Sequence, residues 1–228
     1  MKIFDAHTHA DFITPNFQSD VVGALCCAVN ESGWGKIADL INSDNRLYGA
    51  FGIHPWYIDT LVPGFDKRLE SVLLSGKNRM VGEIGIDKYR PFIDVQIRAF
   101  AIQFDIAVKL KRIVCLHCVG AWDKIMHVFG QYKKSEMPII IAHNFNANDD
   151  ITEKLLQYET IYFSFGKNIM RGKNRRIEQI PMDKILVETD GHPDVLLADV
   201  LTQISKIKNN PNAPEIIYNN MLKVLSDE

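Results

Sequence analysis

The 228-residue chain is 46% hydrophobic and 24% charged, which is typical of a soluble globular protein and excludes a disordered, collagen-like or coiled-coil sequence. Its formal net charge of -2 excludes the overall positive charge of many nucleic-acid-binding proteins, so a polyanionic partner would have to be held locally. No apolar run approaches the roughly 18 residues of a membrane span, and MKIFDAHTHADF lacks the apolar core of a signal peptide. We therefore expect a cytoplasmic protein with no membrane partner, whose four cysteines are free thiols.

Eight short runs rich in β-branched and apolar residues are predicted to be strands. In chain order they cover residues 2–6, 21–29, 47–53, 80–86, 112–118, 138–144, 160–166 and 184–190. Longer amphipathic segments lie between them, with the clearest helices predicted over 94–111, 148–159 and 196–208. In the first helix we expect Asp94 to be the N-cap, and the apolar stripe leaves Gln96 and Gln103 on its polar side.

The alternation of strands and helices indicates the fold class. Parallel neighbours need crossover connections of helical length, and near-continuous apolar strands indicate a sheet that is covered on both faces. We predict an α/β fold in which residues 1–228 form a single-domain (β/α)8 TIM-type barrel, because no linker or low-complexity tract interrupts the chain. A doubly wound open sheet is the structural alternative.

The DAHTH motif stands where the first predicted strand ends. Successive side chains of a strand point to opposite faces, so Asp5, His7 and His9 should converge on one side. Polar groups aimed at one spot are costly to bury unless something satisfies them, and two imidazoles at this spacing suit a single metal ion.

Further acidic and histidine side chains follow the later predicted strands. They are His54, Glu83, His117, His143 and Asp190. In a barrel the carboxyl ends of the strands form one face, where the active site is built. Each residue alone has an ordinary structural interpretation, but together they exceed the needs of one tetrahedral ion and suggest two divalent ions with a bridging carboxylate. Mixed nitrogen and oxygen ligands suit Zn, Mn, Ni or Fe better than Mg, although the sequence does not fix the choice.

Six motifs carry a resemblance to a known family. DAHTH, GIHP, VGEIGID, LHC, AHNF and VETD, in this order, resemble the motifs of the TatD family, metal-dependent hydrolases of the amidohydrolase superfamily that are similar to deoxyribonucleases. The segments QIRAFAIQFDIAVKL and IYFSFGKNIM extend the resemblance over nearly the whole chain.

The resemblance implies a TIM-type barrel that holds two divalent ions. The first ion would be bound by His7, His9, Glu83 and Asp190, and the second by Glu83, His117 and His143, so that Glu83 is the bridge. It also implies that Asp190 orients or deprotonates the attacking water and that His54 is directed at the substrate. The implied reaction is hydrolysis of a phosphate ester in nucleic acid.

Several positions depart from the family pattern. His117 is followed by Cys118, Val119 and Gly120, where the family often has an arginine two residues beyond the histidine. His192 stands where the family usually has no histidine, and the chain is shortened after Asp190. These differences leave the ligand set intact but make the substrate uncertain.

Other residues offer weaker signals. A basic cluster is formed by Lys167, Arg171, Lys173, Arg175 and Arg176, which either contacts phosphates or is a solvated surface. Trp56 and Tyr57 either stack on bases or cap the barrel rim. In CLHC, we expect Cys115 to point into the barrel and Cys118 away from it, while Glu188 and Asp5 are candidates to support the metal ligands.

The leading hypothesis is a two-metal hydrolase of DNA-like phosphodiesters with no obligate protein partner. Its catalytic residues would be Asp190, Glu83 and His54, and its substrate contacts His54, Trp56, Lys167 and Arg171. One alternative keeps the metal site but changes the substrate to an amide, an ester or a small phosphate compound. Another is a non-catalytic barrel that binds nucleic acid.

Overall fold

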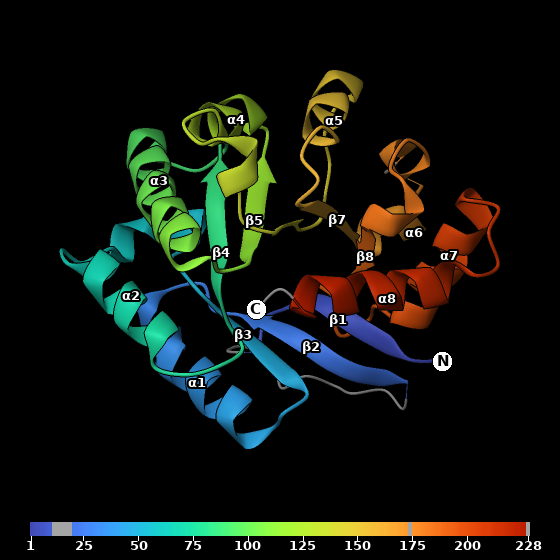
Figure 1. The fold of residues 1–228 in the computed structure, drawn as a ribbon, viewed down its shortest axis with the longest axis horizontal. Helices are drawn as coiled ribbons and strands as arrows, with labels where there is room; N and C mark the ends of the chain where they lie inside the picture. Colours follow the sequence, from blue (N-terminus) through green and yellow to red (C-terminus); the bar gives the residue numbers. More distant parts are fainter. Residues whose placement is uncertain (11–19, 173–174, 227–228) are drawn as a thin grey trace.

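The computed structural model describes residues 1–10, 20–172 and 175–226, and its eight parallel strands form one sheet in the order β1 to β8. The strands are β1 (Ile3–Thr8), β2 (Val21–Cys27), β3 (Leu47–Phe51), β4 (Arg79–Asp87), β5 (Val114–Val119), β6 (Ile140–Ala142), β7 (Ile161–Phe165) and β8 (Ile185–Val187). Figure 1 shows them following one another around a barrel from blue β1 to orange β8, with helices outside. All eight predicted strands and the TIM-type barrel are confirmed.

Helices α1 to α6 connect successive strands from β2 to β8, and α7 and α8 follow β8. They are α1 (Trp34–Ser43), α2 (Phe65–Leu74), α3 (Ile93–Leu110), α4 (Trp122–Phe129), α5 (Asp149–Leu155), α6 (Lys167–Met170), α7 (Leu197–Ile207) and α8 (Ala213–Ser226). The short 3-10 helices are η1 (Glu31–Gly33), η2 (Pro55–Thr60), η3 (Lys134–Glu136), η4 (Arg175–Glu178) and η5 (Met182–Lys184). In the described part of the chain no helix is both long enough and apolar enough to cross a membrane.

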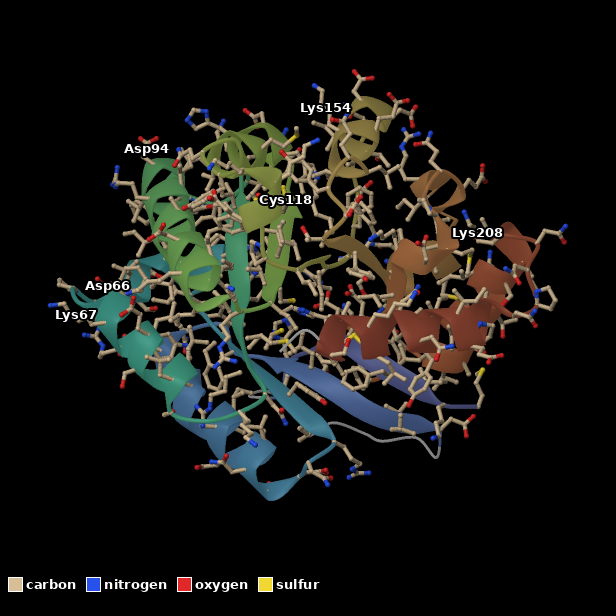
Figure 2. All side chains as sticks on the ribbon, in the orientation of Figure 1. Asp66, Lys67, Asp94, Cys118, Lys154 and Lys208 are labelled. Carbon is tan, nitrogen blue, oxygen red and sulfur yellow. The ribbon has the colours of Figure 1, made fainter. Side chains whose placement is uncertain are left out.

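The start of α3 differs from the prediction. Phe92 is the N-cap residue. Its backbone is left-handed (φ 62°), and its side chain makes no capping hydrogen bond. Asp94 instead lies in the first turn, at the tip of α3 in Figure 2, where its carboxylate interacts favourably with the positive end of the helix dipole. The predicted N-cap was therefore wrong by two positions.

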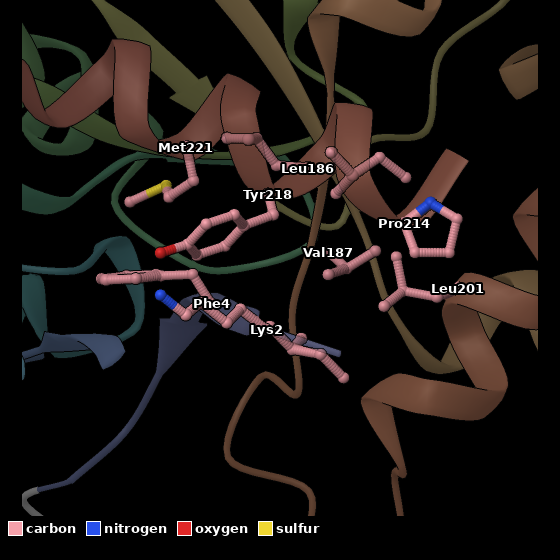
Figure 3. A pocket seen from close by; sticks show the side chains of 10 residues that line it. Lys2, Phe4, Leu186, Val187, Leu201, Pro214, Tyr218 and Met221 are labelled. Carbon is pink, nitrogen blue, oxygen red and sulfur yellow. The ribbon is translucent and has the colours of Figure 1, made fainter. Parts of the chain in front are cut away.

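The interior of the barrel is filled at its amino end. All eight strands contribute to one inner cluster of buried side chains, which includes Phe4, Met80 and Leu186. Met221 of α8 joins this cluster, and Figure 3 shows it beside Phe4 and Leu186. A gap of ≈ 10 Å³, about the space of one water molecule, lies beside Phe4, Leu186 and Met221. The amino end of the barrel interior is therefore filled by side chains.

Strand β1 is irregular, and Asp5 and His7 do not share a side of it. Phe4 and Ala6 belong to the inner cluster, and the register with β2 then shifts between Asp5 and Thr8. Asp5, which lies between these two inward-facing residues, accepts hydrogen bonds from the backbone N–H (3.0 Å) and hydroxyl (2.6 Å) of Thr189. The expectation that Asp5 converges with the histidines was wrong, since its side chain joins β1 to the segment after β8.

Two glutamines of α3 are buried, although the helical pattern predicted them on its polar side. Gln103 accepts a hydrogen bond from the backbone N–H of Ile53 (2.7 Å) and donates one to its carbonyl (3.3 Å). Gln96 accepts from the backbone N–H of Asp87 (2.9 Å) and donates to the carbonyl of Pro91 (2.8 Å). Both side chains thus fix irregular backbone at the carboxyl ends of β3 and β4.

Candidate metal centre

Five histidines and two carboxylates meet at the carboxyl end of the barrel. They are His7 and His9 at β1, His54 after β3, Glu83 in β4, His117 in β5, His143 after β6 and Asp190 after β8. The structure brings together every ligand candidate that the sequence suggested. Glu83 lies at the centre of this group and is only 1% exposed.

The two oxygens of Glu83 face different sets of imidazoles. Oε2 lies 3.3 Å from Nε2 of both His7 and His9. Oε1 lies 2.8 Å from Nδ1 of His117 and 3.2 Å from Nε2 of His143. One carboxylate can therefore contribute an oxygen to each of two adjacent cation sites.

The first set of atoms has the spacing of ligands around one ion. Nε2 of His7 and Nε2 of His9 are 3.2 Å apart, and Asp190 Oδ1 lies 3.6 and 3.5 Å from them. Two ligand atoms bound about 2.0–2.1 Å from a tetrahedral ion are about 3.3–3.4 Å apart. With Oε2 of Glu83, these four atoms need only small shifts to hold a divalent cation.

Hydrogen bonds at the opposite ring nitrogens settle which imidazole atoms carry lone pairs. Nδ1 of His9 lies 3.2 Å from the carbonyl of Cys27, which can only accept, so Nδ1 holds the proton and Nε2 the lone pair. In its neutral form His143 likewise carries the proton on Nδ1, which donates to Glu188 Oε1 (3.1 Å), so Glu188 lies where a supporting carboxylate was expected. Both rings thus present a metal-binding nitrogen to the centre.

His54 has the opposite arrangement, although it lies in the same group. Its Nδ1 accepts a hydrogen bond from the backbone N–H of Trp56 (3.1 Å), so the proton of the neutral ring is on Nε2. Burial lowers the pKa of His54 to about 4, which keeps the ring neutral. Its Nε2 lies 3.2 Å from Glu83 Oε1 and is a hydrogen-bond donor there.

Unpartnered buried atoms indicate that the residues fit a bound cation. Glu83 Oε2 and His117 Nε2 are inaccessible to solvent and have no hydrogen-bond partner among the residues that the structure describes. A buried carboxylate oxygen without a partner is costly, and a divalent cation between it and the imidazoles would satisfy it. The donor set of imidazoles and carboxylates suits Zn, Mn, Ni or Fe.

The carboxylates of the centre are ionised. Burial alone would raise the pKa of Glu83, but the imidazoles of His54, His143 and His7 hold it well below its ordinary value. The pKa of Asp190 is also lowered, because its interactions with the imidazoles of His9, His143 and His7 outweigh its burial. Both side chains are therefore anionic at neutral pH and can bind cations.

An open pocket of ≈ 260 Å³ adjoins the centre at Asp190. Its lining includes Lys167, Arg171, Asn168 and His192, and His192 Nε2 lies 3.9 Å from Asp190 Oδ2. The pocket therefore combines cationic and amide groups with one of the candidate ligands.

The described side chains of the predicted basic cluster have different partners. Lys167 forms an ion pair with Asp194 (2.8 Å) at the pocket, whereas Arg176 pairs with Asp149. Lys173 lies outside the described residues. Two of the predicted basic residues, Lys167 and Arg171, thus face the same pocket as Asp190.

Trp56 lies at the rim of the barrel in η2. Its indole N–H donates to Asp87 Oδ2 (2.7 Å), and the Arg90 guanidinium covers one ring face at 3.9 Å from the centroid. The side chain is still 50% exposed. The structure therefore agrees with the rim interpretation, and base stacking by Trp56 stays a prediction. Sequence reasoning missed Asp87, the last residue of β4, as the anchor of this indole.

A TIM-type barrel that gathers imidazoles and carboxylates into adjacent ligand sets at its carboxyl end defines a metal-dependent hydrolase. The family model of the TatD-related DNases matches residues 4–225. The chain therefore belongs to the TatD family, and it is a hydrolase that acts on ester bonds.

Sequence relatives support this family membership. An uncharacterised metal-dependent hydrolase of Mycoplasma genitalium is 29% identical over 222 residues, which cover 83% of this chain and 80% of the relative. The 3'-5' ssDNA/RNA exonuclease TatD of Salmonella typhimurium is 24% identical over 208 residues, which cover 88% and 79%. The human 3'-5' RNA nuclease TATDN2 is 25% identical over 192 residues, which cover 74% of this chain and 25% of that protein.

Solved structures share the fold. The TatD homologue YjjV of Escherichia coli has a TM-score of 0.83 at 23% identity and covers 99% of this chain and 96% of its own. A TatD family hydrolase of Entamoeba histolytica has a TM-score of 0.80 at 13% identity, with 98% and 97% covered. These similarities agree with the eight-stranded barrel described above.

Proposed function

We propose that this chain hydrolyses phosphodiester bonds at the 3' end of single-stranded DNA, with two divalent cations at the carboxyl end of its barrel. The observation that carries the proposal is the position of the Glu83 carboxylate. Its Oε1 and Oε2 face separate sets of imidazoles at 2.8–3.3 Å. The Salmonella and human relatives are 3'-5' nucleases, which supports a single-stranded nucleic acid as the substrate.

The two ions would share Glu83 and differ in their other ligands. His7, His9, Glu83 and Asp190 would hold the first, and Glu83, His117 and His143 the second. When bound, the ions would bring the pKa of the attacking water toward neutrality and offset the charge that develops on the phosphate. The tautomers deduced for His9 and His143 support these assignments, because each leaves Nε2 free to donate a lone pair.

Asp190 is the proposed acceptor of the proton of the attacking water. It is anionic, its side chain is 25% exposed, and it lines the open pocket while its Oδ1 faces the first set of ligands. His54 is neutral and carries its proton on Nε2, so it would donate a hydrogen bond to a phosphate oxygen instead of binding an ion. The cationic groups of Lys167 and Arg171 would hold the phosphate backbone beside Asp190.

The test is hydrolysis of a 5'-labelled single-stranded oligodeoxynucleotide by purified protein whose metal content has been measured. We expect shortening from the 3' end that chelation stops and that added Mn2+ or Zn2+ restores. His117→Ala and Asp190→Asn should abolish it. His127→Ala is the matched control, because His127 is an exposed histidine of α4 outside the centre. Cleavage that survives removal of all metal would contradict the proposal.

A small phosphate ester, amide or ester is the alternative substrate class. The pocket of ≈ 260 Å³ beside Asp190 favours this possibility, because it is closer to the size of a single nucleotide than to an extended strand. A panel of nucleoside monophosphates, lactones and N-acyl compounds, assayed beside the oligonucleotide, separates the two. Turnover confined to the oligonucleotide would reject the alternative.

A further inference from the structure

Two thiols lie beneath the metal centre inside the barrel. Cys27 of β2 and Cys115 of β5 belong to the inner cluster, and both are 0% exposed. Their sulfurs lie 3.4 and 3.0 Å from Nδ1 of His7, whose Nε2 faces Glu83 on the other side of the ring. The three atoms His7 Nδ1, Cys27 Sγ and Cys115 Sγ all lie within 4.8 Å of one another.

The spacing of these atoms is close to that of a tetrahedral metal site. With Zn–S bonds of about 2.3 Å and Zn–N bonds of about 2.0–2.1 Å, a ligand nitrogen and sulfur are about 3.5 Å apart and two sulfurs about 3.8 Å. The nitrogen–sulfur distances of 3.4 Å to Cys27 and 3.0 Å to Cys115 approach this value. Shifts of a few tenths of an ångström would therefore admit an ion.

We propose that His7, Cys27 and Cys115 form a separate binding site for a soft, thiophilic cation such as Cd2+ or Cu+. Two sulfurs and one imidazole nitrogen are a donor set that selects soft cations over Mg2+ or Mn2+. The candidate metal centre around Glu83, called the upper centre below, contains only imidazoles and carboxylates. The two sites therefore differ in the metals they prefer. The thiols release their protons to solvent when the ion binds.

The other cysteines do not belong to this site. Cys26 lies in the layer between the strands and the helices, and Cys118 packs against that same layer. The sequence expectation for β5 is thus confirmed, with Cys115 inside the barrel and Cys118 outside. Cys118, which is partly exposed, provides a matched control for substitutions of the two inner thiols.

The shared residue His7 makes the soft-metal site inhibitory. A neutral imidazole has one lone pair, so a cation at Nδ1 leaves the ring proton on Nε2. Nε2 then becomes a donor toward Glu83 Oε2, and the first set of ligands in the upper centre loses one member. This consequence rests on the proposed two-ion function, whereas the existence of the soft-metal site does not.

The test of the site is titration of the metal-free 228-residue protein with Cd2+. Thiolate-to-metal charge transfer absorbs in the ultraviolet, and imidazoles and carboxylates give no such band. We expect a band that saturates at one bound ion in the wild type and in Cys118→Ser, and that is lost in Cys27→Ser and Cys115→Ser. X-ray absorption of the Cd2+-loaded wild type should show two sulfur neighbours, which keeps the test independent of the folding of the variants.

A wild type that binds Cd2+ without a charge-transfer band or sulfur neighbours would overturn the site, as would a band that persists in both inner variants. For the inhibitory effect, one equivalent of Cd2+ should lower Mn2+-supported hydrolysis by about tenfold in the wild type and in Cys118→Ser. Cys27→Ser should keep its own uninhibited rate when Cd2+ is added. Equal inhibition of the wild type and Cys27→Ser would refute the coupling through His7. A protein without hydrolase activity would defeat the proposed function but leave the spectroscopic test intact.

Discussion

Replacement of Glu83 by glutamine tests the central feature of the site. Glutamine has nearly the same shape but offers one carbonyl oxygen and one NH2 group. In either orientation of the amide, one imidazole set faces a hydrogen-bond donor where it now faces an oxygen at 2.8–3.3 Å. We therefore expect Glu83→Gln to lose at least one of two bound ions.

The size of the effect follows from the contacts of the two oxygens. A hydrogen bond or ligand contact to a charged group contributes about 1.5–3 kcal/mol, and Glu83 provides one such contact to each proposed ion. At about 1.4 kcal/mol for each factor of ten, the affinity of the ion that faces the amide NH2 group should fall roughly 10- to 150-fold. The rate of hydrolysis at limiting metal concentration should fall by at least the same factor as the affinity for the more weakly bound ion.

Equilibrium dialysis with elemental analysis measures the change directly. The wild type should bind two ions at micromolar free Zn2+ or Mn2+, and Glu83→Gln one or none. Glu31→Gln is the control. Glu31 lies in η1, away from the centre, and its partly exposed carboxylate pairs with Arg68 of α2. Circular dichroism shows whether both variants fold. Two ions bound to Glu83→Gln with wild-type affinity would refute the bridging role.

Three further substitutions test the surroundings of the centre. Glu188→Gln removes the anionic acceptor of His143 Nδ1 (3.1 Å) and should weaken ion binding roughly 10- to 100-fold by calorimetry, whereas an unchanged affinity would show that Glu188 does not orient the ring. Arg171→Ala should raise KM for single-stranded DNA, leave kcat unchanged and reduce the salt slope of binding by about 0.7. Lys109→Ala is the control and should change none of these three quantities, because Lys109 lies in the last turn of α3, pairs with Glu70 and does not line the pocket. Gly85→Ala would place a Cβ 1.8 Å from the carbonyl oxygen of His117 and should lower the free energy of unfolding by about 3 kcal/mol or more, and an unchanged melting temperature would contradict this.

Much of the fold was predictable because its signals are local. Each strand is a short apolar run bounded by polar residues, and the connecting segments carry helical periodicity, so the alternation indicated a parallel sheet, with a barrel favoured over a doubly wound open sheet. The ligand candidates were predictable for a related reason. Parallel strands end on the same face of a barrel, so a histidine or carboxylate at the end of each strand needs no long-range information to be placed near the others.

Features that depend on long-range contacts were not predictable. The side-chain alternation that was used for DAHTH assumes a regular strand, but the register of β1 shifts between Asp5 and Thr8, so Asp5 bonds to Thr189 while His7 faces Glu83. The helical pattern likewise treated Gln96 and Gln103 as solvent-facing. Both are buried because backbone groups at the carboxyl ends of neighbouring strands need hydrogen-bond partners, and no pattern within α3 records those groups.

The roles of individual histidines depend on contacts that a motif does not contain. His9 and His54 both follow strands and both lie within 3.3 Å of Glu83, yet a carbonyl at Nδ1 of His9 makes its Nε2 a lone-pair donor. A backbone N–H at Nδ1 of His54 makes its Nε2 a proton donor. The partner of the distant ring nitrogen thus distinguishes His9, a proposed metal ligand, from His54, a proposed substrate contact. The same reasoning gives His7 its particular importance, because the atoms at its Nδ1 are sulfurs, which can accept a proton or share a cation.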